Sequence, residues 1–214
     1  MISMQTTLPT DVWVSATWEE YEQAIASPVY TNAKGYYHNG QMRIEMAPVG
    51  PNHAGCSGVA ALLVNLFGIA KGVPMRSLSN CSYRKRDVRE CQPDLSYYVG
   101  DRVSLSPQGS SVVDLDSTPA PDLAIEIADT SLADDLGVKR LLYEDVGVAE
   151  YWVVDVQQAH ITAFRILPDQ GSQRIAQSQV LPGLAIALLD EALQRSRQMD
   201  NSQVGAWFLA EVQK

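Results

Sequence analysis

Two apolar segments, residues 122–128 and 150–156, flank a stretch in which apolar side chains recur at helical spacing. That stretch, residues 132–146, is predicted to be a helix, and Gly147 suits its C-terminus. A helix between two strands forms the long crossover that two parallel strands of one sheet require. The chain is therefore expected to have an α/β (α+β) fold, with a mixed central sheet flanked by helices.

The rest of the chain supplies an N-terminal helix, a hairpin and further strands. Thr17 and Glu20 form a capping-box pattern that predicts a short helix ending before Pro28. Residues 34–46 alternate around Asn39-Gly40, a typical hairpin turn. The other expected elements are an apolar helix at 53–70, strands at 73–81, 91–99 (interrupted early by Pro93) and 160–166, a basic turn between the first two of these, a surface loop at 100–119, and two short helices in the tail.

Length and cysteine content indicate the kind of protein and its compartment. A chain of 214 residues with 46% hydrophobic residues fits one domain over 1–214, with a core at about 34–190 and a helical tail at about 190–214. The N-terminal residues lack a signal-peptide pattern, and the richest apolar run, 59–70, is too short to span a membrane. Three cysteines without metal-type spacing indicate reduced thiols, so we expect a cytoplasmic protein with no membrane association.

The charge balance restricts how the chain could bind nucleic acid. A net charge of −9 weighs against adhesion through bulk electrostatics, although positive charge can be locally concentrated. The one concentrated basic segment contains Arg84, Lys85, Arg86 and Arg89. It is interpreted either as a solvated hairpin tip or as a contact with backbone phosphates.

Glu126 is the residue of the 122–128 strand that most needs an explanation. Side chains alternate along a strand, so Glu126 shares its face with Ala124 and Ala128, while Ile125 and Ile127 point the other way. A carboxylate among apolar neighbours is costly to bury without a partner. Glu126 is therefore expected to face a metal ion or a buried cation, or else to lie on an edge strand facing water.

Two Pro-Asp pairs supply candidate partners for Glu126, and geometry separates them. Asp122 lies four residues away along the same strand, roughly 13 Å, too far to share one cation whose ligands lie at roughly 2.0–2.6 Å. Asp94 belongs to another strand and can reach if the two strands are neighbours, since these run roughly 4.8 Å apart. The sequence therefore favours Asp94.

The helix after Glu126 carries a lysine on its apolar face. Lys139 falls on the same stripe as the apolar residues of 132–146, with Asp135 and Tyr143 one turn to either side. Such a lysine commonly extends along its stem to water. Because the helix follows directly from the strand of Glu126, the ammonium could instead return over the same site.

These residues resemble a known family. The run from Pro93-Asp94 through Glu126, Lys139 and Tyr143 to the segment GVAEYWVVD at 147–155 is similar to the Uma-two family of proposed restriction endonucleases. That family is abundant in cyanobacteria and belongs to the PD-(D/E)xK nuclease superfamily. The resemblance extends from about residue 34 to the LPGLAI segment at 181–186, and it implies a restriction-endonuclease-like core.

The resemblance also implies roles for individual residues. Asp94 and Glu126 would be the metal ligands, and oxygen ligands favour Mg²⁺, with Mn²⁺ possible, over Zn²⁺. The superfamily lysine normally stands two residues after the acidic one, where this chain has Ala128, so Lys139 would take its place and orient or deprotonate the attacking water. The supporting residues would be Tyr143, His53 and Glu45, and for His53 a helix-cap or core role is the alternative.

The function expected from these features is a metal-dependent endonuclease acting on DNA. The alternatives are a catalytically silent nuclease-fold module that binds DNA or a protein partner, and a hydrolase of another phosphate ester. A two-fold homodimer is expected because it presents two sites to the two strands of a duplex. Trp207, Phe208 and Leu209 in the tail would supply the dimer contact or would pack on the protein's own core.

Overall fold

The computed structural model describes residues 8–46, 49–169 and 171–214, and within them the chain forms two mixed sheets and six α-helices. The helices are α1 (Trp18–Ile25), α2 (Pro51–Lys71), α3 (Leu132–Asp135), α4 (Val138–Val146), α5 (Ile186–Arg195) and α6 (Asn201–Val212). The main sheet contains β4 (Met75–Ser79), β7 (Leu95–Val99), β9 (Leu123–Ala128), β10 (Glu150–Asp155), β11 (His160–Ile166) and β12 (Ser172–Ile175). The second sheet contains β1 (Val14–Ser15), β2 (Lys34–His38), β3 (Gln41–Glu45), β5 (Tyr83–Lys85), β6 (Arg89–Cys91) and β8 (Val113–Asp114).

The main sheet has the order β12-β11-β10-β9-β7-β4. β9 and β10 are parallel, with Leu123 beside Glu150, and the chain between them forms α3 and α4. The predicted crossover and the α+β fold class are therefore confirmed. β9 is an inner strand and all six of its residues are buried, so Glu126 does not lie on an edge facing water.

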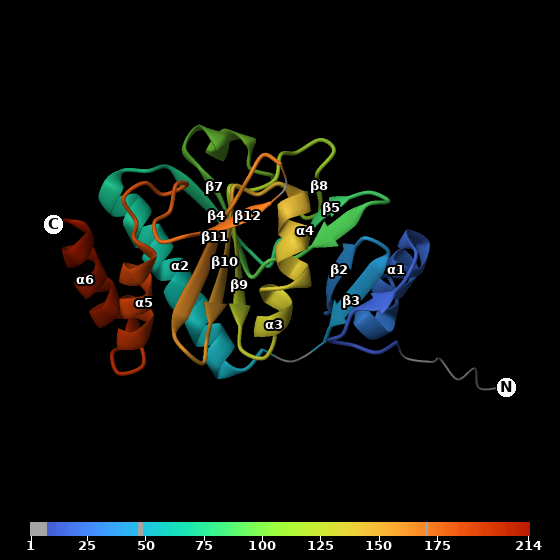
Figure 1. Ribbon diagram of the computed structural model, residues 1–214, viewed down its shortest axis with the longest axis horizontal. Coiled ribbons are helices and arrows are strands. Elements are labelled where there is room, and N and C mark those ends of the chain that lie inside the picture. Colours follow the sequence, from blue (N-terminus) through green and yellow to red (C-terminus); the bar gives the residue numbers. More distant parts are fainter. Residues whose placement is uncertain (1–7, 47–48, 170) are drawn as a thin grey trace.

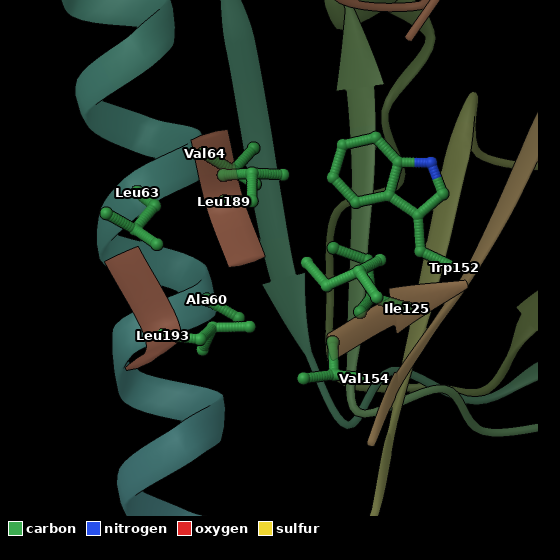
Figure 2. Close-up of a pocket in the computed structure, with 9 residues that line it drawn as sticks. Ala60, Leu63, Val64, Ile125, Trp152, Val154, Leu189 and Leu193 are labelled. Atoms are coloured by element: carbon green, nitrogen blue, oxygen red, sulfur yellow. The ribbon is translucent and has the colours of Figure 1, made fainter. Parts of the chain in front are cut away.

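One face of the main sheet carries the larger apolar core. α2, α5 and α6 cover this face, on the left of Figure 1. Ile125, Trp152 and Val154 project from the sheet toward α2, as Figure 2 shows, and a gap of only about 10 Å³ is left between them and the helices. This space is lined by apolar side chains and is too small for a ligand.

Of the described helices, α2 alone has the length and apolar composition of a membrane-crossing helix. The helix runs over Pro51–Lys71, slightly longer than the expected 53–70. It is therefore longer than the apolar run at 59–70, which by itself is too short to span a membrane. Leu63, Val64 and Phe67 on this helix are buried in the core beneath the sheet. Apolar side chains all around a helix are typical of a position between a sheet and other helices as well as of a membrane span.

The opposite face of the main sheet packs against α3, α4 and the second sheet. Its core is rich in aromatic residues: Tyr36 and Tyr83 come from the second sheet, and Tyr143 from α4 stacks on Tyr151 from β10 with ring centroids 4.5 Å apart. Ala124 and Ala128 lie on this face of β9, as the alternation predicted, and leave room for the larger rings. Glu126 therefore projects into the space between the two sheets.

The N-terminal part of the second sheet follows the prediction. β2 and β3 form the expected hairpin, and Asn39 and Gly40 both have positive φ, at 49° and 72°, which a two-residue turn of this type requires. Thr17 and Glu20 form the expected capping box at the start of α1. This hairpin carries Lys34, Tyr36 and Glu45 toward the main sheet.

The structure differs from the predicted elements in several details. The helix expected at 132–146 is divided at Gly137, where a Cβ would meet the Ala133 carbonyl at 2.8 Å. The strand expected at 91–99 is interrupted at Pro93, as predicted, but Cys91 belongs to β6 of the second sheet and only β7 to the main sheet, and the basic turn forms the β5–β6 hairpin of the second sheet. The loop expected at 100–119 contains a 3₁₀ helix, Gly100–Leu105, and strand β8. Strand β12 was not predicted, because its four residues are mostly polar.

The tail residues pack against the chain's own core. Phe208 is fully buried in the larger core, and Trp207 packs against the same cluster while the guanidinium of Arg195 lies over its ring at 4.3 Å. Leu209 is partly buried. These contacts correspond to the second of the two expectations for the tail, so the tail supplies no separate reason for a dimer.

Candidate metal and active site

Asp94 and Glu126 lie opposite each other on neighbouring strands. Leu95 of β7 pairs with Ile125 of β9 in antiparallel register, and one step outward in that register sets Asp94 beside Glu126. The backbone N–H of Ile127 also donates to Oδ2 of Asp94 at 2.8 Å, which ties the aspartate to β9. Both carboxylates line one cavity of about 440 Å³ between the two sheets.

Glu126 is held by hydroxyl groups and lies near one ammonium. Its Oε1 accepts a hydrogen bond from the Tyr143 hydroxyl at 2.7 Å, and the Tyr36 hydroxyl lies 3.2 Å from the same oxygen. Burial raises the pKa of Glu126 to about 8, and the negative charges of Asp94 and Asp135 add to this although Lys139 opposes it. The charged form of Glu126 therefore lacks sufficient positive charge around it.

Asp94 has the opposite electrostatic setting. Burial alone would raise its pKa, but a hydrogen bond from His53 and the positive charge of Lys34 outweigh burial and hold the pKa well below its usual range. Nε2 of His53 lies 3.3 Å from Oδ2, and Nζ of Lys34 forms an ion pair with Oδ1. Asp94 is therefore ionised throughout the physiological pH range.

Lys139 is enclosed by carboxylates. Its Nζ lies 2.8 Å from Glu45, 3.0 Å from Asp135 and 3.9 Å from Glu126, and it sits 4.3 Å from the centre of the Tyr36 ring. Burial would lower the pKa of Lys139, but the three carboxylate charges outweigh it and raise the pKa well above its ordinary value. The ammonium stays charged and does not accept a proton at neutral pH.

The residues expected in supporting positions also line this cavity or border it. His53 at the start of α2 and Glu45 at the end of β3 both face it, and the pKa of Glu45 is lowered by Lys139 and Arg43 against the effect of burial. Tyr143 is buried beneath it and contacts Glu126 directly. Asp122 lies elsewhere, as predicted, since it accepts from the Val99 N–H at 2.8 Å and pairs with Arg102.

Sequence reasoning missed three residues of this site: Lys34, Tyr36 and Arg43. Arg43 lies 2.8 Å from Glu45 and 3.2 Å from Asp134. Lys34 and Tyr36 are two residues apart on β2, and alternation along the predicted hairpin would have set them on one face. Nothing local showed that this face meets β7 and β9, because that contact joins parts of the chain far apart in sequence.

The basic segment expected to bind DNA lies on the β5–β6 hairpin, outside the cavity lining. Arg84 pairs with Glu90 and with Glu22, and Lys85 lies 3.9 Å from Asp116. For Arg86 and Arg89 no ion pair occurs within the described part of the chain. Part of this positive charge is therefore already neutralised by the protein.

The residues of the cavity fit a hard cation only with the help of further ligands. Within the described ranges, no group of three or more His, Cys, Asp or Glu side chains is arranged to hold a metal ion. Two neighbouring carboxylates remain, and Oε2 of Glu126 accepts no hydrogen bond from the described residues. A carboxylate pair suits Mg²⁺, because this ion keeps several water ligands and uses one or two carboxylates.

The fold belongs to a class already seen in a solved structure. That structure, from Anabaena variabilis ATCC 29413, is titled a "putative nuclease belonging to DUF820"; it is 18% identical and covers 90% of this chain and 98% of its own, with a TM-score of 0.52. The two chains therefore share one α+β fold. No curated protein sequence matches the chain.

The family model described as "Putative restriction endonuclease", Uma2, matches residues 18–201. The chain belongs to the Uma2 family. The resemblance inferred from the Pro93-Asp94 to Asp155 motifs is thereby confirmed.

Proposed function

We propose that this chain is a metal-dependent endonuclease that hydrolyses phosphodiester bonds of DNA. One observation carries the proposal: Asp94 and Glu126 from adjacent strands line one cavity, and Glu126 is buried with too little positive charge around it. A divalent cation beside the two carboxylates would supply that charge. Family membership supports nuclease chemistry for the chain as a whole.

The residues around the cation would have different roles. Asp94 and Glu126 would hold Mg²⁺ or Mn²⁺, which when bound polarises a phosphodiester and lowers the pKa of a water molecule. The hydroxyl of Tyr143 fixes Oε1 of Glu126, and the Ile127 N–H fixes Oδ2 of Asp94, so both carboxylates are oriented before any ligand enters. Lys139 would keep Glu45, Asp135 and Glu126 together by its charge, and acts as a positioning residue.

A catalytically silent module that binds DNA or a protein partner is the second candidate. The net charge of −9 and the pairing of Arg84 and Lys85 with acidic side chains favour its protein-binding form, because both weaken attraction to phosphates. In its DNA-binding form, Arg86 and Arg89 would be the residues of the basic segment that remain for backbone phosphates. The two candidates differ in one measurable property, turnover.

Cleavage of supercoiled plasmid and of single-stranded DNA tests the proposal. With Mg²⁺ or Mn²⁺ the wild type should nick the plasmid, and EDTA should stop it. Asp94→Asn should reduce the rate by a factor of about a hundred or more, the order of effect of losing one group that stabilises developing charge. Asp101→Asn, an exposed change outside the cavity, is the control and should cut normally. A wild type that binds DNA without cutting it in any metal would favour the silent module.

Symmetric pairing would extend this proposal to both strands of a duplex. Two copies related by a two-fold axis present two cavities at once. Light scattering should then give about twice the monomer mass of 23.4 kDa, and the monomer mass at micromolar concentration would contradict a dimer.

A further inference from the structure

The positive side chains that line the cavity differ in the number of carboxylates with which they already form ion pairs. Lys139 lies within 4 Å of three carboxylates. Arg43 pairs with Glu45 and Asp134, and its Nη1 donates to the Asp11 carbonyl at 2.6 Å. Lys34 pairs with one carboxylate, that of Asp94. Among the described lysines and arginines lining this cavity, Lys34 is thus the least neutralised.

The exposed fraction of the side chain ranks Lys139, Arg43 and Lys34 in the same order as their number of acidic partners does. The side chain of Lys139 is 2% exposed and that of Arg43 is 10% exposed, whereas that of Lys34 is 18% exposed. Lys34 is the first residue of β2 and lines the cavity, and its partial exposure leaves its stem free to follow an incoming ligand. A buried ammonium surrounded by carboxylates could meet a phosphate only by breaking those contacts, which would leave buried charges unpaired.

We propose that Lys34, and not Lys139, is the lysine that contacts the scissile phosphate of DNA. This inference rests on the proposed nuclease function and names the residue that meets the substrate at the same site. Nζ of Lys34 would donate to a non-bridging phosphate oxygen while it remains beside Asp94. Its role is to offset negative charge on the phosphate, and no proton transfer is assigned to it.

His53 also lines the cavity, and 20% of its side chain is exposed. Its Nε2 is directed at Asp94, and the arrangement orients that carboxylate. Lys34 has the longer and more flexible stem, so it can reach past Asp94 toward a ligand. The two residues would therefore act on opposite sides of the same carboxylate.

The test compares Lys34→Met, Lys34→Arg and a matched control, Lys71→Met, which removes an exposed lysine at the end of α2. Cleavage is measured at saturating plasmid with Mg²⁺. Binding of a fluorescent short duplex is measured with Ca²⁺ over a series of salt concentrations. Lys34→Met should cut about a hundredfold more slowly and bind about tenfold more weakly. Lys34→Arg should recover most of the binding, and Lys71→Met should match the wild type.

The salt series separates a phosphate contact from mere support of Asp94. Loss of one phosphate contact should make the slope of log Kd against log salt shallower by about 0.9, an effect that a structural role would not produce. A Lys34→Met protein that cuts and binds like wild type would overturn the inference and leave the nuclease proposal standing. A wild type that binds but never cuts would overturn the nuclease proposal, and the salt slope would then decide on Lys34. A wild type that does neither contradicts both.

Discussion

Glu126→Gln is expected to abolish metal-dependent cleavage. In the absence of metal, the wild type should become less stable as the pH rises, and the Glu126→Gln variant should not. The cause is burial, which together with the charges of Asp94 and Asp135 raises the pKa of Glu126 to about 8 from an ordinary value near 4.5. At pH values between these two pKa values, the folded state binds more protons than the unfolded state does. The unfolding free energy therefore falls as pH rises through this window, by up to about 1.4 kcal/mol per pH unit.

Glutamine keeps the shape of the side chain and cannot ionise. Near pH 5 both proteins carry a neutral group at this position and should have similar stability, whereas by pH 8 the variant should be the more stable of the two. Urea unfolding in EDTA across pH 5–9 measures this difference. Glu191→Gln, an exposed change on α5, is the control and should follow the wild type. Parallel curves for wild type and Glu126→Gln would refute the electrostatic account of the site.

Lys139→Met is expected to destabilise the protein by about 3–5 kcal/mol, the usual effect of removing one partner from a buried ion pair. Methionine fills the space of the lysine stem but leaves Glu45, Asp135 and Glu126 without the ammonium that lies between them. A lysine that only extended along its stem to water would tolerate methionine with little loss of stability. Its enclosure by three carboxylates changes that expectation.

A double variant and a matched control make this prediction specific. Adding Asp135→Asn to Lys139→Met removes one unpaired charge and should recover part of the lost stability. Lys71→Met should change the unfolding free energy by less than about 0.5 kcal/mol, as is usual for a surface substitution. If Lys139→Met unfolds at the same urea concentration as the wild type, Lys139 does not hold the carboxylates together.

The sequence predicted the crossover between β9 and β10 and the faces of their side chains, because both follow from local periodicity, but it gave no order for the other strands. Alternation along β9 set Glu126 on the face of Ala124 and Ala128, and strand spacing favoured Asp94 over Asp122 as its neighbour. The helical stripe set Lys139 on the same side. Each of these inferences needed only the order of elements and the direction of side chains within one element.

The remaining parts depend on contacts that local patterns do not contain. Lys34 and Tyr36 reach the site because the second sheet packs against the first, which no spacing within the hairpin indicates. The helix is divided at Gly137, whose φ of −103° and ψ of −106° lie outside the helical region, while the apolar spacing of 132–146 continues through this position. For the basic hairpin, the sequence showed the charges of Arg84 and Lys85 but not the acidic residues opposite them.

The motif at residues 150–155 shows how a family signature can be structural. Glu150 is buried, and its carboxylate accepts hydrogen bonds from the Trp152 indole and the Ser178 hydroxyl, and from the backbone of Gln179 and Val180. Tyr151 donates to the Asp135 carbonyl and stacks on Tyr143. These residues fix the loop around 178–180 and the position of α3 and α4, so they support the site without lining the cavity.

The central claim is that Asp94 and Glu126 share a cation, and anomalous diffraction from crystals grown with Mn²⁺ tests it most directly. The account predicts an anomalous peak in the cavity between the two sheets, with carboxylate oxygens of Asp94 and Glu126 at roughly 2.0–2.6 Å or bridged to it by one water. The same crystals of Glu126→Gln should lose the peak. A fully occupied manganese elsewhere, with these two carboxylates still bound only to their protein partners, would contradict the account.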